Sequence, residues 1–281
     1  MTLETDINQK CIDAVRILSA QSITNANSGH PGICLGAAPV AYTLFAEFMN
    51  FSYKNPQWEN RDRFVLSAGH GSALLYSLLH LFGMGVTKED LASFRKFGSA
   101  TPGHPEHGVT AGVDASTGPL GQGIANAVGL ALAETHLAAK FNRAGHYIVN
   151  HYTYALCGDG CLEEGISYEA CSFAGTQKLG KLILFYDKND ISIEGDTATA
   201  FSENTAMRFA AMGWQVIEVP NANDVKKIRA AIRDAQRETG KPSVIICRSV
   251  IGFGSPLAGS AEIHGSPLSE EQQKQTNDKL N

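Results

Sequence analysis

The second half of the chain alternates regularly between short apolar runs and segments with helical spacing. The apolar runs predict strands at residues 153–158, 181–186, 214–219 and 243–248. The segments between them predict helices at 164–177, 203–212 and 224–239. Strands that alternate with helices build a parallel sheet with helices on both faces. The sequence therefore predicts an α/β fold with a mainly parallel sheet.

The first half of the chain is predicted to contain mainly helices and one long loop. Apolar side chains near helical spacing predict helices at 6–26, 35–48, 72–82 and 121–141, and a short strand is expected at 64–66. Thr87 and Asp90 have capping-box spacing and predict a short helix. Residues 102–118, rich in Gly, Pro and His, predict a loop. No composition shift marks a second domain, so we expect one domain over 1–281, with a polar tail from about 268 that ends frayed.

Composition excludes several classes of function. The 281 residues carry a net charge of −5 without a Lys/Arg run, which argues against nucleic-acid binding. Residues 1–10 are polar and unlike a signal peptide, and no apolar stretch reaches the roughly 20 residues of a membrane span. We therefore expect a cytoplasmic protein. Because the chain has no broad positively charged surface, an anionic substrate would have to be bound by individual hydrogen-bond donors in its site.

The cysteines fit a reducing compartment better than a zinc site. Cys157 and Cys161 are separated by three residues, and no second pair of cysteines completes a zinc site. Cys157 also falls in a strand that should be buried. We expect buried free thiols.

Two polar segments follow neighbouring strands. Gly158-Asp159-Gly160 comes directly after one predicted strand, and Asn189 follows the next. The carboxyl ends of parallel strands are where such sheets bind ligands. Carboxylate and amide oxygens suit Mg²⁺ or Ca²⁺, and glycines let the backbone approach a diphosphate. A pair of ordinary turns is the alternative interpretation.

Five further motifs occur in a fixed order along the chain. They are Ser28-Gly29-His30-Pro31-Gly32, Arg61-Asp62-Arg63 through Ser67-Ala68-Gly69-His70-Gly71, Thr101-Pro102-Gly103-His104-Pro105-Glu106, Thr117-Gly118-Pro119-Leu120-Gly121, and Ile263-His264-Gly265. Together with the Gly-Asp-Gly segment, they resemble the diphosphate-binding domain of transketolases, from about residue 7 to about 268. The resemblance implies the three-layer thiamine-diphosphate-binding fold.

The resemblance also implies a role for each motif residue. Thiamine diphosphate and Mg²⁺ would be the cofactors, with Ca²⁺ or Mn²⁺ as other options for the metal. His30 and His264 would flank the sugar oxygens, and His104 would bind a hydroxyl of the ketose donor. Glu164 would lie at a subunit interface near the catalytic centre. The implied metal ligands are Asp159, Asn189 and the carbonyl of Ile191, and the implied cofactor contacts are His70, Gly118, Leu120, Gly160, Asn189 and His264.

The implied activity is transfer of a two-carbon ketol unit from a ketose phosphate to an aldose through a carbanion held on thiamine diphosphate. The family's pyrimidine-activating glutamate belongs to a domain that this sequence does not contain. We therefore expect the N-terminal subunit of a split transketolase, active only with a partner chain that carries the pyrimidine-binding and C-terminal domains, with two copies of each. A truncated chain would look the same, and the polar tail favours a natural end.

Three alternatives stay open at this level. The chain could be a component of a 2-oxo acid dehydrogenase, a relative of deoxyxylulose-phosphate synthase, or a non-catalytic partner subunit. Arg61 and Arg63 could bind a phosphate, although structural arginines beside a strand are the favoured interpretation.

Overall fold

The computed structural model describes residues 3–193 and 195–280 of the chain. Its main sheet has five strands, all parallel, in the order β1 (Arg63–Leu66), β2 (Thr153–Gly158), β3 (Leu182–Lys188), β7 (Ser243–Arg248) and β6 (Gln215–Val219). Every residue of β2 is buried, as is nearly all of β3 and β7, which explains why these strands read as continuous apolar runs. The predicted α/β fold is confirmed.

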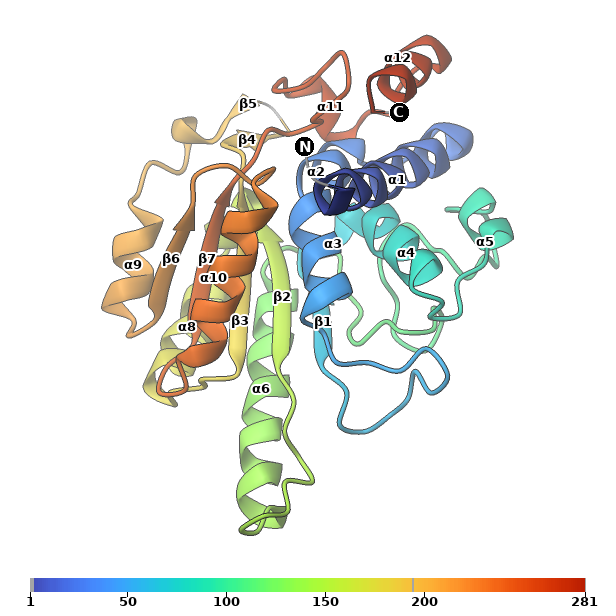
Figure 1. Ribbon diagram of the computed structural model, residues 1–281. Helices are drawn as coiled ribbons and strands as arrows, with labels where there is room; N and C mark the ends of the chain where they lie inside the picture. The colour runs from blue at the N-terminus through green and yellow to red at the C-terminus, as the bar shows by residue number, and fades with distance from the viewer. Residues whose placement is uncertain (1–2, 194, 281) are drawn as a thin grey trace.

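Helices cover both faces of this sheet (Figure 1). On one face, α6 (Gln122–Phe141) packs against the first three strands and against α8 (Gly165–Thr176). On the other, α10 (Val225–Arg237) packs against β6, β7 and α3 (Ala38–Glu47). Short α9 (Thr205–Ala211) packs on β6 at the edge of the sheet.

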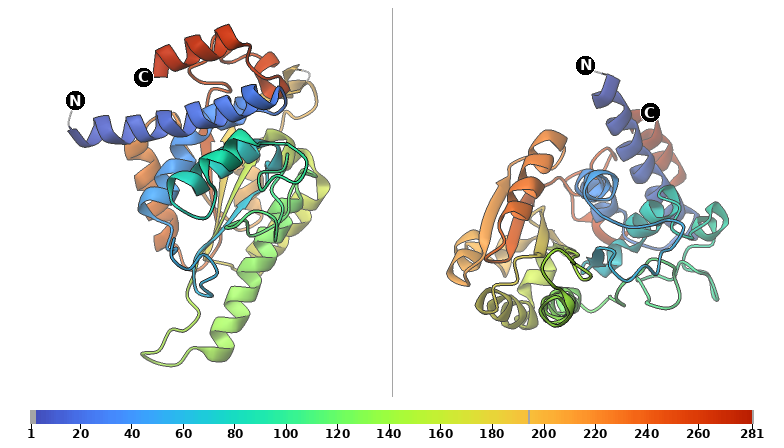
Figure 2. Two further views of the ribbon diagram at one scale, coloured as in Figure 1. Left: turned by 90° about the vertical axis from the view of Figure 1, so that its right-hand side faces the viewer. Right: turned by 60° about the horizontal axis from the view of Figure 1, so that its bottom comes forward.

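A further layer lies beyond the carboxyl ends of the strands (Figures 1 and 2). Long α1 crosses the molecule there and packs on α4. The elements of this region and its flank are α1 (Leu3–Ala26), α2 (Pro31–Gly36), η1 (Gly69–Gly71), α4 (Ser72–Leu81), α5 (Lys88–Ala92), α7 (Asp159–Glu163), the hairpin β4 (Ile191–Ser192) and β5 (Gly195–Asp196), η2 (Thr197–Thr199), α11 (Glu262–Gly265) and α12 (Glu270–Leu280).

One helix predicted from the sequence is wrong in an informative way. The single helix expected at 35–48 is divided into α2 and α3. Pro39 lies in the first turn of α3 and lacks the N–H that would continue α2, so the first helix ends before it. The helix expected at 164–177 is confirmed as α8, and the separate short helix α7 precedes it, with Glu164 between the two.

The predicted frayed tail is also wrong, because residues 270–280 form α12 and pack on α1. Gln273 is only 4% exposed, and the Thr24 hydroxyl donates to its Oε1 at 3.1 Å. Leu280 lies close against Gly254. The polar sequence of α12 does not predict this packing, because its buried side chains are amides and hydroxyls that have hydrogen-bond partners.

Other local predictions are confirmed. Thr87 and Asp90 form a reciprocal capping box at the start of α5. All six cysteines are free, Cys157 lies in a fully buried strand, and only Cys11 is more than slightly exposed. The Arg61 guanidinium forms an ion pair with Asp114 at 2.5 Å, at the amino end of β1, so the structural interpretation of this arginine holds.

None of the helices within residues 3–193 and 195–280 is both long enough and apolar enough to cross a membrane.

The start of α6 depends on a glycine. A Cβ at Gly123 would lie 2.4 Å from the Cα of Ser67, which follows β1. At the same place, the Ser67 hydroxyl accepts the N–H of Ile124 at 3.1 Å. Two turns further along the same helix, Gly129 is exposed, and a Cβ there would meet nothing within 4 Å. The small residues of α6 therefore differ in role according to the face on which they lie.

We expect opposite effects from the same substitution at these two glycines. Gly123→Ala should lower the free energy of unfolding by about 1–3 kcal/mol because backbone must move to admit the methyl group. Gly129→Ala should raise it by about 0.5–1 kcal/mol because alanine is the better helix former. Chemical denaturation of the purified chain measures both. Equal stabilities of the two variants would show that α6 does not approach Ser67 as closely as described.

Candidate active site

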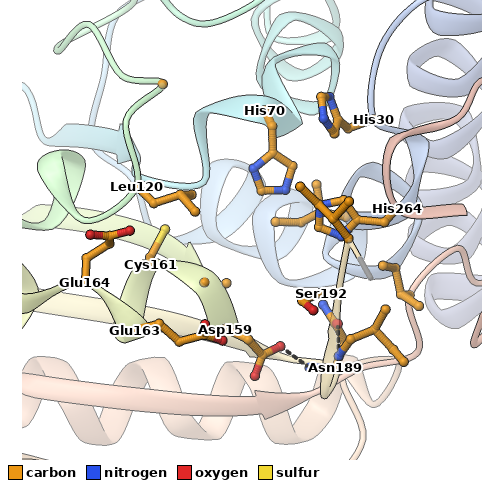
Figure 3. A pocket seen from close by; sticks show the side chains of 17 residues that line it. His30, His70, Leu120, Asp159, Cys161, Glu163, Glu164, Asn189, Ser192 and His264 are labelled. Carbon is orange, nitrogen blue, oxygen red and sulfur yellow. Dashed lines mark hydrogen bonds between the residues drawn. The ribbon is translucent and has the colours of Figure 1, made fainter. Parts of the chain in front are cut away.

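A cavity of about 340 Å³ opens at the carboxyl ends of β2 and β3 (Figure 3). The structure brings every site residue named from the sequence to its wall, with the exception of His104. Figure 3 shows three histidines on one side of this cavity and Asp159 and Asn189 on the other. The predicted residues that line it are His30, His70, Gly118, Leu120, Asp159, Gly160, Glu164, Asn189, Ile191 and His264.

The oxygen-rich side of the cavity is built by the ends of two adjacent strands. Asp159 follows β2 and Asn189 follows β3, and these strands pair in register up to Gly158 and Asp187. One oxygen of the Asp159 carboxylate accepts the backbone N–H groups of Asn189 and Asp190, each at 3.2 Å. The predicted juxtaposition of a carboxylate and an amide is therefore present.

Two buried residues that sequence reasoning did not single out hold this pair in place. The Tyr186 hydroxyl donates to the other oxygen of Asp159 at 2.5 Å. The Asn189 amide donates from Nδ2 to Asp187 at 2.9 Å, while its Oδ1 accepts the N–H of Ile191 at 3.0 Å. Because Nδ2 is committed to Asp187, the identity of the amide oxygen is fixed.

Burial disfavours the charged forms of the two carboxyl groups on this side of the cavity. Asp159 is 3% exposed, and burial raises the pKa of its carboxyl, against the opposing hydrogen bonds from Tyr186 and Asn189. Asp187 is 1% exposed, and burial raises its pKa to about 6, against the opposing hydrogen bonds from Ser249 and Asn189. A buried carboxylate is costly, and the attraction to Lys188 only partly offsets the effect of burial, so a divalent cation at Asp159 would be stabilised.

The residues present fit a hard divalent cation. Asp159, the oxygen of Asn189 and the carbonyl of Ile191 are oxygen donors of the kind that Mg²⁺ and Ca²⁺ prefer. Within the described ranges, no cluster of three or more His, Cys, Asp and Glu side chains could hold a metal. The oxygen donors of Asp159, Asn189 and Ile191 instead form a set with a single charged side chain. Such a set leaves coordination positions of the metal open for the phosphate oxygens of a ligand.

Three histidines from distant parts of the chain meet on the opposite side. The ring centres of His30 and His70 lie 5.1 Å apart, and those of His70 and His264 lie 5.3 Å apart in a stacked arrangement. His30 and His264 are separated by 5.9 Å. The rings can therefore contact one ligand together, as the sequence motifs suggested.

Each histidine is placed by tight packing of its neighbours. His264 lies in short α11, and Ile263 beside it is fully buried against Ile251 and Leu35. A Cβ at Gly69, beside His70, would lie 2.8 Å from the N of Gly118. This contact brings the Thr117–Leu120 loop to the wall of the cavity.

The histidines are neutral at pH 7. Burial lowers the pKa of His30 to about 4, with His264, Arg95 and His104 adding to the effect. Burial, reinforced by His264 and His30, lowers the pKa of His70 to about 3. The pKa of His264 is also lowered by burial. Neutral imidazoles can both donate and accept hydrogen bonds, so they can hold sugar or phosphate oxygens and transfer protons.

His104 and Glu164 lie at the rim. His104 is exposed and touches Gly118, and its carbonyl accepts the Tyr76 hydroxyl at 3.1 Å. The prediction that His104 is part of the site is therefore met only in the sense that it lies beside a lining residue. Glu164 is exposed at the start of α8 and contacts no side-chain cation in the described ion pairs.

Sequence reasoning missed the apolar part of the wall and one arginine. Ile33, Ile251 and exposed Ile193 line the cavity beside Leu120. Isoleucines next to glycines and polar residues carry no distinct signal of a site. Arg95, which lies against His30, precedes the Thr101–Glu106 motif and belongs to no pattern of its own.

The chain matches the family model described as "Transketolase, thiamine diphosphate binding domain" over residues 7–281. It is 57% identical over 271 residues to a transketolase of Bacillus subtilis (strain 168), covering 96% of this chain and 41% of the relative. It is 54% identical to transketolase 1 of Escherichia coli (strain K12), with 95% and 41% covered. The chain thus spans about two fifths of the length of these relatives.

Solved structures agree with this similarity. The transketolase of Leishmania mexicana superposes with a TM-score of 0.96 at 50% identity, covering 97% of this chain and 41% of that one. A transketolase of Pichia stipitis in complex with sedoheptulose 7-phosphate gives a TM-score of 0.96 at 48% identity, with 98% and 40% covered. These relatives support the transketolase interpretation, and they do not support the alternatives considered from the sequence.

The lowered pKa of His70 predicts a pH-dependent stability. Below pH 6.5 the unfolded chain takes up a proton on this residue that the folded chain refuses, so the free energy of unfolding should fall as pH drops from about 6.5 towards 3. His70→Gln removes the titrating group, so the variant should lose less stability than the native chain between pH 7 and pH 4.5.

Denaturant unfolding of both proteins at a series of pH values measures the two slopes. Comparing two proteins cancels the contribution of other groups, including Asp187, whose raised pKa acts in the opposite direction. Identical slopes would contradict the neutral, buried state of His70.

Proposed function

Because the chain belongs to the family of transketolase thiamine diphosphate-binding domains, we propose that it is the cofactor-binding part of a transketolase. In this role it binds the diphosphate of thiamine diphosphate and one side of a ketose substrate. The single observation that carries the proposal is the meeting of His30, His70 and His264 across one cavity from Asp159 and Asn189.

Charge balance supports a metal-bridged diphosphate. The lining includes the carboxylates of Asp159, Glu163 and Glu164, and none of the described lining residues is Lys or Arg. A diphosphate would be repelled unless a cation accompanied it. We assign Asp159, Asn189 and the Ile191 carbonyl to that cation, with Mg²⁺ as the first candidate and Ca²⁺ or Mn²⁺ as alternatives.

The remaining contacts follow from the shape of the wall. Gly160 offers its backbone N–H close to Asp159, and His70 and His264 can donate to phosphate oxygens. Leu120 and Gly118 lie beside the cavity where the apolar isoleucines also gather, which suits the heterocyclic part of the cofactor. When bound, thiamine diphosphate would supply the electron sink for cleavage of a C–C bond.

We assign the sugar contacts to the histidines. His30 and His264 line the same cavity with neutral rings, so they can hold hydroxyl and carbonyl oxygens and move a proton between them. His104, at the exposed rim beside Gly118, would bind a hydroxyl of the donor. The Pichia stipitis transketolase binds sedoheptulose 7-phosphate, and a phosphorylated ketose is the donor class that we propose here.

Activity should require the part of a transketolase that this chain does not match. About three fifths of the length of the relatives is missing from the alignment. We propose that a partner polypeptide supplies it, with two copies of each chain and Glu164 at the junction, because this carboxylate is exposed at the rim of the cavity. The pyrimidine-activating glutamate would come from the partner. The six free cysteines suit a reducing compartment, and we propose the cytoplasm.

The test of the proposed function is an activity titration. The chain alone, with thiamine diphosphate and Mg²⁺, should not transfer a ketol unit from a ketose phosphate to an aldose. Adding a polypeptide equivalent to the unmatched part of the Bacillus subtilis transketolase should restore turnover in proportion to the complex formed. Full turnover by the chain alone would refute the need for a partner, and turnover with pyruvate but not with a ketose as donor would refute the transketolase assignment.

Asp159→Asn should separate metal binding from folding. The substitution removes a buried negative charge but leaves one oxygen for three donors, the Tyr186 hydroxyl and the N–H groups of Asn189 and Asp190, so the cofactor-free chain should still fold with a stability lower by about 1–3 kcal/mol. The rise in melting temperature on adding Mg²⁺ and thiamine diphosphate should be lost, because the carboxylate is the only charged donor in the proposed cation site.

Thermal unfolding with and without the two ligands measures both effects, in the complex with the partner. Glu169→Gln, the same chemical change at an exposed position of α8, serves as the control and should keep the ligand-induced rise. An undiminished rise in Asp159→Asn would remove this residue from the metal site.

A further inference from the structure

We propose that Arg95 is a positioning residue that holds His30 in the tautomer with its hydrogen on Nε2. Arg95 lies outside every sequence motif described above, yet its guanidinium lies against His30. The assignment of a tautomer stands on geometry alone. Its meaning for catalysis rests on the proposed function.

The guanidinium of Arg95 ties together two histidine-bearing loops. Its Nη1 donates to the Ser28 hydroxyl at 2.9 Å, just before His30 in the chain. Its Nη2 lies 3.5 Å from Nδ1 of His30 and 3.5 Å from the carbonyl of Gly103, which precedes His104. One rigid planar group therefore spans the loops that carry His30 and His104.

The direction of the contact with His30 follows from the chemistry of the two groups. A guanidinium has only N–H donors and cannot be deprotonated in a protein. Nδ1 of His30 must therefore present its lone pair, and a neutral imidazole carries a single hydrogen. The hydrogen then lies on Nε2. A hydrogen on Nδ1 would instead point at the N–H groups of Arg95 without an acceptor.

The groups that act on the pKa of His30 include no anion. Besides burial they are His264, Arg95 and His104, and each of them lowers it. The ring edge around Cδ2 and Nε2 lies against Gly265, where a Cβ would be 3.3 Å away. Any larger residue at position 265 would press on the ring that Arg95 orients.

Arg95 is held in place at a cost in conformational energy. Its φ is 61°, in the left-handed region that a long side chain seldom adopts. Its Nε is buried without a hydrogen-bond partner. Strain and an unsatisfied polar atom at one residue persist only where the surrounding structure determines its position, and such residues concentrate at functional sites.

The consequence is a defined role for His30. With Nδ1 engaged, the nitrogen left to a ligand in the cavity is Nε2, and it carries a hydrogen. His30 would then donate a hydrogen bond to a substrate oxygen and stabilise negative charge that develops there. The group that accepts a proton from the sugar would be a different one, for which His264 is the available neighbour at 5.9 Å.

Nitrogen NMR of the ¹⁵N-histidine-labelled full chain tests the tautomer without cofactor or activity. The shifts of the two ring nitrogens distinguish a protonated from an unprotonated position, and His30→Asn identifies the signals of His30. We expect Nδ1 unprotonated and Nε2 protonated at pH 7.5. A hydrogen on Nδ1 in the native chain would overturn the proposal.

Arg95→Gln tests whether Arg95 sets this state. An amide can accept as well as donate, so the variant should show a mixture of tautomers, whereas Arg95→Lys, which can only donate, should keep the hydrogen on Nε2. In the complex with the partner, Arg95→Gln should lower kcat about 10- to 100-fold, and Arg95→Lys should recover part of it.

Arg237→Gln, at an arginine whose side chain is 74% exposed on α10, is the control and should change neither the spectrum nor kcat. An unchanged tautomer in Arg95→Gln would overturn the role of Arg95. Should Arg95→Gln fail to fold, the spectra of the native chain and of Arg95→Lys decide the question. A correct tautomer in a complex that transfers no ketol unit would refute the proposed function and leave the role of Arg95 standing.

Discussion

The close approach of backbone segments above the carboxyl ends of the strands is the constraint on which this structure depends. A Cβ at Gly32 in α2 would lie 2.7 Å from Ile251 and 2.9 Å from the carbonyl of Ile263, and the Gly252 N–H donates to the Gly32 carbonyl at 2.9 Å. This contact joins the segment after β7 to α2, so that His264 arrives beside His30. The gathering of histidines is thus a result of backbone packing, and side-chain contacts refine it.

The two sides of the cavity differ in their electrostatics. On the strand side, burial disfavours the charged form of the carboxylates and raises their pKa values, and Lys188 offsets this only in part at Asp159. On the histidine side, burial keeps the rings neutral. A negatively charged ligand that brings its own divalent cation meets both sides at once, because the cation satisfies Asp159 and the anion accepts hydrogen bonds from the imidazoles. The same features make a bare anion or a bare cation a poorer fit.

The sequence predicts most of this arrangement for one physical reason. Strands buried on both faces read as apolar runs, so their ends can be located, and parallel strands put those ends at one edge. The apolar runs therefore predict that Asp159 and Asn189 lie at the same edge of the sheet, and the pairing of β2 with β3 brings them together. The packing of α12 on α1 could not be predicted, because a polar helix is buried through Gln273 and Thr24, which are far apart in the chain. Tyr186 and Asp187 could not be assigned to the site from the sequence, because there they look like ordinary strand residues.

Arg95 shows where prediction from sequence stops and why. Its partners, Ser28, His30 and Gly103, are separated from it by different distances along the chain, so no spacing rule connects them. The left-handed backbone at Arg95 has no compositional signature either, because the residues typical of that region are glycine and asparagine. A motif identifies residues that touch a ligand through their type and order. The groups that decide which atom of such a residue carries a proton are recognised only after the loops have been brought together in space, and the protonation of His30 depends on one of them.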